Sequence, residues 1–224
     1  MSIFWKIYSM AYDILLELAP YQEMIRDVGA GIPAVDKLQV LDAGCGTGNL
    51  LQFLEKKIPG ATLVGIDLSP EMLQLARTKI SGQTSLIQAD LNKALPFHDA
   101  AFGLITSTNV LYFVKEPRYT LQEYQRLLNP GGLLILTTLK PGFAPLKIIS
   151  EHMKKVGFFR TLRFVMPLIW VGLCNIYSLN NKNFHYFNKP ELESLIKAAG
   201  FLTVSIKETY AGQDWLVVAD KSPK

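Results

Sequence analysis

The stretch that decides the fold reads Val40-Leu41-Asp42-Ala43-Gly44-Cys45-Gly46-Thr47-Gly48-Asn49-Leu50. An apolar strand passes into a loop with glycine at alternate positions, and the loop passes into a helix. Glycine lets backbone N–H groups approach a ligand that a Cβ atom would push away. The first turn of the helix adds N–H groups that have no partner within the helix. The stretch therefore predicts a site for a nucleoside cofactor.

Short β-rich runs alternate with helical patterns through the first 140 residues, which is typical of βαβ units on a parallel sheet. Strands are predicted at 39–42, 62–67, 85–88, 102–107 and 132–138, with helices at 49–57, 70–80 and 117–128. Two helices are also predicted earlier, at 4–18 and 22–28.

Local signals for helix starts and turns lie between these elements. Ser69 precedes Pro70 as an N-cap with proline in the first turn, and the run Asn-Pro-Gly-Gly at 129–132 predicts a stop and a turn. Near the end, a helix at 189–199 precedes two alternating segments, 201–207 and 215–219, whose short connection favours an antiparallel hairpin.

Length and composition fit one globular domain with an insertion. The chain has 224 residues, 49% hydrophobic and 19% charged, with a net charge of +4. We expect N-terminal cap helices at 1–30, a cofactor-binding core at 38–139, an apolar and basic insertion at 140–188, and a final helix and hairpin at 189–220.

Cellular location is inferred from cysteine usage and from the N-terminus. Cys45 and Cys174 give no disulfide framework, which fits a reducing cytoplasm. Lys6, Asp13 and Glu17 interrupt the first apolar segment, so no signal peptide is predicted. The three histidines lack metal-ligand spacing, and no metal site is predicted.

The glycine pattern distinguishes between cofactors. A dinucleotide fingerprint would place its third glycine at position 49, where this chain has Asn49, and the extra glycine falls one residue early at Gly48. The pattern Asp-x-Gly-x-Gly-x-Gly from Asp42 resembles class I S-adenosylmethionine-dependent methyltransferases. The likeness is greatest to the small-molecule branch (methyltransferase type 11) that includes the ubiquinone and menaquinone enzymes, and it covers most of 38–139.

The resemblance implies a fold and a cofactor. The fold is α/β, a Rossmann-like seven-stranded sheet of order 3-2-1-4-5-7-6 with the last strand antiparallel. Helices cover both faces, and a helical insertion precedes the last helix. The implied cofactor is S-adenosylmethionine.

Further motifs support the resemblance. Asp67 ends the second predicted strand, within a segment, 64–73, that is similar to the family's second motif, whose acid accepts both ribose hydroxyl protons. Asp90 and Leu91 lie in a segment similar to the third motif, at the adenine. Tyr12, which precedes Asp13, looks like part of a pair found where N-terminal helices cover the cofactor. The cofactor-binding residues implied are Tyr12, Asp42, Gly44, Cys45, Gly46, Gly48, Asp67, Leu68, Met72, Asp90, Leu91 and Asn109.

Each of these motifs also has a plainer interpretation. The glycines could form only a tight turn. Asp67 and Asp90 could be helix caps or solvated loop acids, and Asp42 could accept backbone donors that hold the loop. Cys45 could fill the loop, and Tyr12 could pack on the sheet.

The acceptor of the methyl group is less constrained. No catalytic base is predicted, and Tyr112, His185 and Tyr186 are candidates for contacting the acceptor. The chain lacks the Asn/Asp-Pro-Pro-Tyr/Phe run of enzymes that methylate exocyclic amines, and it lacks the Pro-Cys nucleophile of cytosine C5 enzymes. We therefore expect no nucleic-acid partner.

The apolar composition of the insertion favours a hydrophobic acceptor. A basic flank adjoins the apolar run 164–174, which is shorter than the roughly 20 residues needed to span a bilayer. The segment 158–174 could contact a membrane interface, cover an apolar pocket, or form a buried cap or dimer surface. We expect methyl transfer to a hydrophobic or lipid-like acceptor, such as a quinone precursor or a phospholipid headgroup.

The rival functions are an NAD(P)-dependent oxidoreductase and a non-catalytic cofactor-binding module. The expected location is cytoplasmic, with contact at the inner face of a membrane left open.

Overall fold

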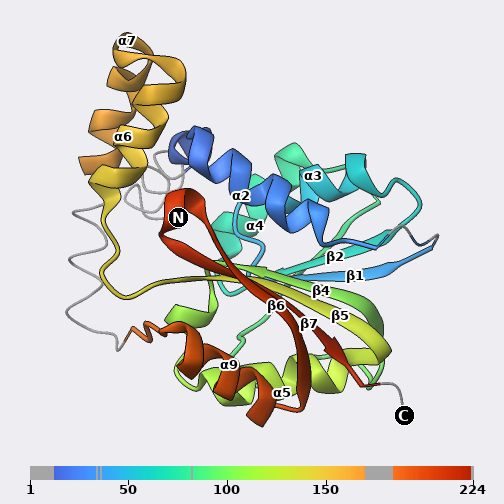
Figure 1. The fold of residues 1–224 in the computed structure, drawn as a ribbon. Helices are drawn as coiled ribbons and strands as arrows, with labels where there is room; N and C mark the ends of the chain where they lie inside the picture. The colour runs from blue at the N-terminus through green and yellow to red at the C-terminus, as the bar shows by residue number, and fades with distance from the viewer. Residues whose placement is uncertain (1–12, 34, 36, 82, 170–183, 223–224) are drawn as a thin grey trace.

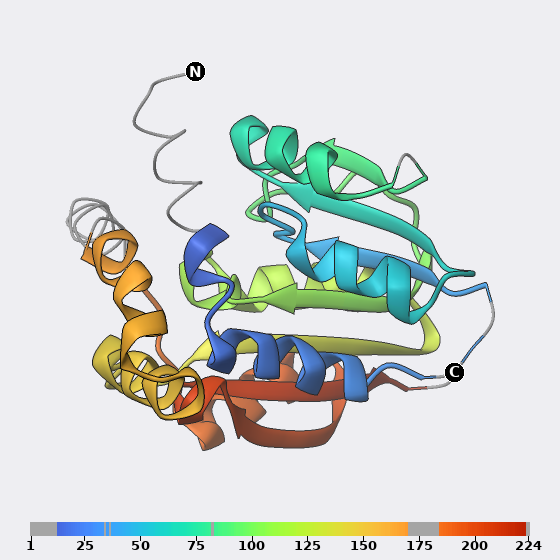
Figure 2. The same cartoon turned by 90° about the horizontal axis from the view of Figure 1, so that it is seen from above.

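The computed structural model describes residues 13–33, 35, 37–81, 83–169 and 184–222. Its centre is a seven-stranded sheet with helices on both faces (Figures 1 and 2). The strand order is β3-β2-β1-β4-β5-β7-β6, which confirms the predicted order. The strands are β1 (Gln39–Ala43), β2 (Thr62–Asp67), β3 (Ser85–Gln88), β4 (Phe102–Thr108), β5 (Leu128–Leu139), β6 (Phe201–Thr209) and β7 (Asp214–Lys221).

Strand directions determine what gathers at each edge of the sheet. The strands β1 to β5 pair in parallel, whereas β7 runs antiparallel to both β5 and β6, as predicted for the terminal hairpin. Leu139 at the end of β5 therefore faces Asp214 at the start of β7. The start of β7 thus shares an edge with the carboxyl ends of the parallel strands, where ligands of such sheets bind.

Two hydrophobic clusters hold helices to the two faces. Leu134 and Leu136 of β5 point toward the face covered by α5 (Pro117–Leu127) and α9 (Lys189–Ala198), whereas Ile135 points to the other face. That second face carries α2 (Ala19–Ala30), α3 (Asn49–Lys57), α4 (Pro70–Lys79) and part of α6 (Pro145–Val156). Figure 1 shows α2 and α3 on one side of the sheet, with α5 and α9 on the other.

The helix starts follow from local sequence. The Ser69 hydroxyl accepts a hydrogen bond from Met72 N at 3.2 Å, which confirms the predicted N-cap of α4. Asn188 and Glu191 form a capping box at the start of α9. The helix α2 begins at Ala19, three residues before the predicted start, with Pro20 in its first turn.

The predicted turn at 129–132 is wrong in part. The helix α5 does end at Leu127, but β5 already begins at Leu128, so the Asn-Pro-Gly-Gly run lies inside the strand. The register shifts there: Phe102 pairs with Leu128 and Leu104 with Leu133. Gly131, with a φ of 72°, lets the strand absorb the extra residues as an irregularity instead of ending.

Beyond β5 the chain forms a helical projection at the carboxyl edge of the sheet. It consists of α6, α7 (Phe158–Thr161) and the 3₁₀ turn η2 (Leu162–Phe164). Figure 1 shows α6 and α7 extending away from the sheet. Of the predicted insertion, residues 170–183 lie outside the described residues. Within the described ranges, no helix is long and apolar enough to cross a membrane.

Candidate active site

The glycine loop is folded back onto the end of β2. Both Gly44 N and Cys45 N donate to the carbonyl oxygen of Ile66, at 2.8 and 2.9 Å. Gly44 has a φ of 78°, and a Cβ atom there would lie 2.4 Å from Val110 Cγ2. Gly46 also has a positive φ, of 53°, but a Cβ atom on it would meet nothing within 4 Å. The loop is therefore closely packed below Gly44 and open above Gly46.

Asp67 at the end of β2 holds this loop. One of its carboxylate oxygens accepts from Gly46 N and the other from Ser69 N, both at 2.9 Å. Burial raises the pKa of Asp67, and these backbone donors oppose the rise. A carboxylate offers about four lone-pair positions, so Asp67 can accept further hydrogen bonds.

Asp42 does not hold the glycine loop through backbone donors. It is 1% exposed, and its Oδ1 accepts from the Thr106 hydroxyl at 2.9 Å. The alternative that Asp42 accepts backbone donors is therefore wrong: its partner is a side chain, and Asp67 binds the loop instead. Asp42 Oδ2 is buried without a partner. Burial raises the pKa of Asp42 to about 7, and the Asp67 charge contributes to the rise.

The remaining predicted cofactor residues line the adjacent edge. Asp90 Oδ1 accepts from Asn92 N and Nδ2, at 3.0 and 2.8 Å, and the backbone bond is the main cause of its lowered pKa. Asp90 is thus ordered as a loop acid. Leu68 is largely exposed, whereas Leu91 is buried in the core. Cys45 is buried, and burial raises the pKa of its thiol far above the usual range.

The N-terminal segment reaches the glycine loop through Asp13. Its carboxylate accepts from the Thr47 hydroxyl at 2.5 Å and pairs with Lys79 of α4 at 2.7 Å. Asn49 donates to the Thr47 hydroxyl at 3.1 Å. Thr47 and Lys79 were missed by the sequence reasoning, because no motif links positions so far apart. Tyr12 lies outside the described residues.

The three candidates for contacting the acceptor are close together. Tyr112 lies in the 3₁₀ turn η1 (Leu111–Phe113) after β4, and its carbonyl accepts from His185 N at 2.9 Å. Its ring stacks with those of Phe184 and Tyr186, at centroid distances of 5.8 and 6.4 Å. We call these three rings, Tyr112, Phe184 and Tyr186, the aromatic shelf.

Asn109, predicted where cofactor and acceptor meet, follows β4 directly. Its φ is 56°, and its backbone N donates to both Oγ1 and O of Thr137 in β5. Its Oδ1 is buried without a partner. The next residue, Val110, is the one that packs under Gly44, so Asn109 adjoins the glycine loop.

Comparison with known proteins agrees with this geometry. A family model described as "Methyltransferase domain" matches residues 41–136. A demethylmenaquinone methyltransferase of Thermus thermophilus is 34% identical over 197 residues, covering 85% of this chain and 87% of that protein. The chain belongs to the class I S-adenosylmethionine-dependent methyltransferases. Its cofactor is accordingly S-adenosylmethionine, and the rival assignment as a nicotinamide oxidoreductase is set aside.

Two further methyltransferases match, one over part of the chain and one at low sequence identity. A malonyl-[acyl-carrier protein] O-methyltransferase of Herminiimonas arsenicoxydans is 39% identical over 111 residues, covering 50% of this chain and 41% of that protein. A methyltransferase structure from Aquifex aeolicus aligns with a TM-score of 0.66 at 19% identity, covering 98% of this chain and 99% of the other. At that identity the structural likeness shows the methyltransferase fold alone.

Proposed function

We propose that this methyltransferase binds its cofactor over the open side of the glycine loop and methylates a hydrophobic hydroxyaromatic acceptor of the quinone-precursor type. The observation that carries the proposal is the open space at Gly46, whose backbone N donates to Asp67. Val110 packs against Gly44 of the same loop, and it lies between Asn109 and the η1 turn that carries Tyr112 of the aromatic shelf.

The residues at the loop suit the cofactor. A Cβ atom would occupy the space that Gly46 leaves open, and the orphaned Asp42 Oδ2 marks an acceptor without a donor in the loop floor. Asp67 would take the ribose hydroxyls with its spare lone pairs. Asp90, with Leu68, Met72 and Leu91, would hold the adenine. Gly44, Cys45, Gly48, Asn109 and Tyr12 would complete the cofactor site.

Methyl transfer requires little covalent chemistry from the protein itself. The cofactor supplies an electrophilic methyl group on a sulfonium. The chain's own residues must orient the acceptor and exclude water, and well-oriented reactants can gain roughly 7–11 kcal/mol from positioning alone. The aromatic shelf supports an acceptor with a flat ring, because offset or stacked rings at such spacings attract one another.

The relatives favour a quinone-type acceptor over an acyl-carrier-protein ester. The demethylmenaquinone methyltransferase matches over most of both chains, whereas the malonyl-carrier enzyme matches over less than half of its own length.

A competition between acceptors tests this proposal. The purified chain is incubated with methyl-deuterated S-adenosylmethionine and either demethylmenaquinol or malonyl-acyl carrier protein, and products are read by mass spectrometry. We expect labelled product from the quinol, and Tyr112→Ala should reduce it at least about tenfold by removing the centre of the shelf. Tyr119→Ala, an exposed tyrosine on α5, is the matched control. Labelling of the carrier protein alone would contradict the proposed acceptor.

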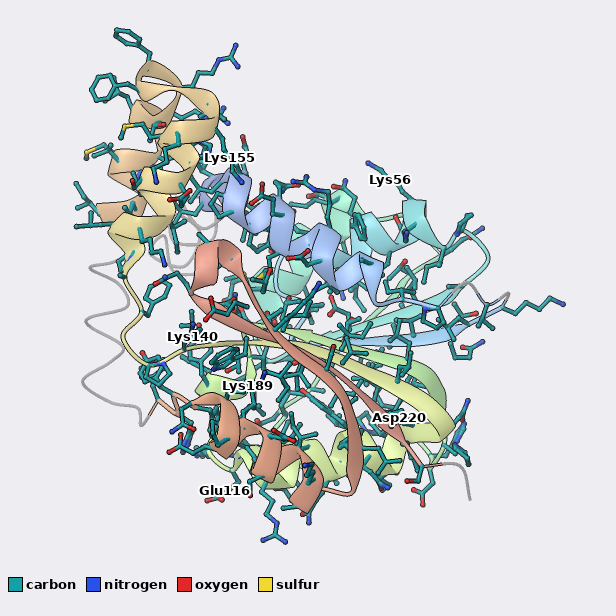
Figure 3. All side chains as sticks on the ribbon, in the orientation of Figure 1. Lys56, Glu116, Lys140, Lys155, Lys189 and Asp220 are labelled. Atoms are coloured by element: carbon teal, nitrogen blue, oxygen red, sulfur yellow. The ribbon has the colours of Figure 1, made fainter. Side chains whose placement is uncertain are left out.

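We further propose that the helical projection, together with residues 165–169 that follow it, contacts an anionic membrane surface from which such an acceptor is drawn. Phe159 is 85% exposed, Met166 71% and Phe158 58%, and Figure 3 shows Lys155 on the same projection. Five cationic residues accompany a single acid, Glu151, in this part of the chain. Exposed aromatic rings beside basic residues suit a membrane interface. This leaves the lid and the dimer surface as the other interpretations.

Vesicle sedimentation tests the membrane contact. Arg163 pairs with Glu17 at 2.5 Å and Lys155 pairs with Glu23, so Phe158, Phe159 and Arg160 are the informative positions. Phe158→Ser/Phe159→Ser and Arg160→Glu should each leave more protein in the supernatant above anionic vesicles. Lys56→Glu on α3 is the charge-matched control for Arg160→Glu. Equal sedimentation of all variants would contradict the contact and favour a lid.

A further inference from the structure

The start of β7 carries an acid that is buried without hydrogen-bonding partners. Asp214 is 0% exposed, and neither of its carboxylate oxygens has a hydrogen-bond partner. Two other buried acids in the described part of the chain have partners: Asp42 accepts from Thr106, and Glu123 accepts from Leu95 N and from Arg126. Burying a carboxylate without donors costs stability, so a purely structural role does not account for Asp214.

Asp214 lies on the α2 face of the sheet together with Asn109. Leu216, two residues along β7, packs in the cluster that contains Met24 of α2, so Asp214 points to the same face. The Asn109 amide contacts Met24 Sδ at 3.7 Å, and the same side chain partly offsets the effect of burial on the pKa of Asp214. Asn109 Oδ1 and both oxygens of Asp214 are buried without a hydrogen-bond partner, and the Asn109 side chain is the group that favours the charged form of Asp214.

The strand order indicates which ligand would supply the donor. Asp67 ends β2 and Asp90 follows β3, on one side of the glycine loop, whereas Asn109 follows β4 and Asp214 begins β7, on the other side. The ribose and adenine of the cofactor fall on the first side under the proposed function. Under the proposed function the acceptor lies on the second side, where its hydroxyl group is a donor for Asp214. Met24, flexible and unbranched, is the side chain that would move to admit it.

Resting on the proposed function, we infer that Asn109 and Asp214 bind a hydroxyl group of the acceptor and that the Asp214 carboxylate takes its proton. The acceptor's O–H bond breaks, the proton joins a carboxylate oxygen, and the electron pair stays on the acceptor oxygen. The acceptor becomes an electron-rich phenolate, which is the form that attacks an electrophilic methyl group. Proton transfer of this kind is worth about 10²- to 10⁴-fold in rate.

Burial suits Asp214 to this role at neutral pH. It raises the pKa of Asp214 to about 7, where a carboxylate is a far better base than a solvated one. Charged side chains around Asp214 pair with one another: Lys140, just after β5, with Glu208 of β6, and Lys207 of β6 with Asp27 of α2. The other titratable groups on α2, η3 (Tyr210–Gly212) and α6 are Tyr21, Glu23, Arg26, Tyr210, Lys147, Glu151, His152, Lys154 and Lys155.

Asp214→Asn tests the inference against Asp220→Asn, which lies on the same strand. The backbone N of Lys140 donates to the carbonyl oxygen of Gln213, just before Asp214 at the start of β7. Figure 3 shows Asp220 far from Lys140, at the other end of the strand. With demethylmenaquinol, Asp214→Asn should lower kcat at least about 100-fold and remove the rise of kcat/KM through neutral pH. Its affinity for S-adenosylhomocysteine should stay within about twofold, and Asp220→Asn should resemble the wild type.

A second measurement does not require turnover. The ¹³C resonance of the Asp214 carboxyl is titrated in the S-adenosylhomocysteine complex, with and without 1,4-naphthalenediol. We expect the diol to shift the resonance and its titration midpoint. If the wild type labels no quinol but the resonance responds, the proposed acceptor is wrong and the hydroxyl site stands. A silent resonance, or normal activity of Asp214→Asn with an unchanged pH profile, would overturn the inference.

Discussion

At the scale of single residues, two glycines of one loop do different work. Both have positive φ, but a side chain on Gly44 would collide with Val110, whereas a side chain on Gly46 would occupy open space. The sequence shows that the loop needs glycine, since the alternate spacing is visible, but it does not show which glycine faces the ligand and which faces the core. That distinction depends on Val110, more than 60 residues away.

These positions lead to a paired prediction. Gly44→Ala should destabilise the fold by several kcal/mol, because it adds a clash with Val110 to the strain of a left-handed backbone. Gly46→Ala should cost only about 1 kcal/mol of stability, from backbone strain alone, yet weaken binding of S-adenosylhomocysteine strongly. Thermal unfolding and calorimetry of both variants check this. Equal loss of stability in the two variants would mean that the space above Gly46 is not open.

At the scale of elements, the parallel core could be predicted and the segments packed against it could not. Alternating patterns, the Ser69 cap and the terminal hairpin gave the sheet, because these signals are local. The Asn-Pro-Gly-Gly run misled because pairing with β4 draws it into β5. Asp13 joins Thr47 and Lys79 across 34 and 66 residues, so only the folded chain reveals that contact.

The Asp13 contact predicts how the N-terminal segment acts. Asp13→Ala should weaken S-adenosylhomocysteine binding by about tenfold, because the segment would no longer be fastened beside the glycine loop. The effect on stability should be smaller, about 1 kcal/mol, since both side chains are partly exposed. Glu17→Ala is the control. Glu17 lies in the same N-terminal segment as Asp13 and pairs with Arg163, so its loss leaves the contact of Asp13 with the glycine loop intact. Calorimetry in which both variants bind alike would contradict the fastening role.

At the scale of the whole molecule, the carboxyl edge concentrates acids that are destabilising when charged. Burial raises the pKa of Asp42 and of Asp214 from 3.8 to about 7. The unfolded chain releases these protons near pH 4 and the native chain near pH 7, so the native state binds more protons in between. The free energy of unfolding contributed by these acids therefore falls as pH rises across that range.

The Asp214→Asn variant should isolate the contribution of Asp214 to the pH dependence of the free energy of unfolding. His152 acts in the opposite direction, because burial lowers its pKa. The difference in unfolding free energy between Asp214→Asn and the wild type should therefore grow with pH from about 4 to about 7, in favour of the variant. Denaturant titrations across this range measure it. A difference that stays constant with pH would mean that the Asp214 carboxyl titrates in the native state as it does in water.

The central claim is that the cofactor lies over the glycine loop with its ribose at Asp67, and calorimetric titration with S-adenosylhomocysteine tests it most directly. The wild type should bind, and Asp67→Ala should bind at least about tenfold more weakly, because it loses charge-assisted hydrogen bonds. Asp99→Ala, a largely exposed acid paired with Arg126, should bind like the wild type. Unchanged affinity in a folded Asp67→Ala variant would contradict the account.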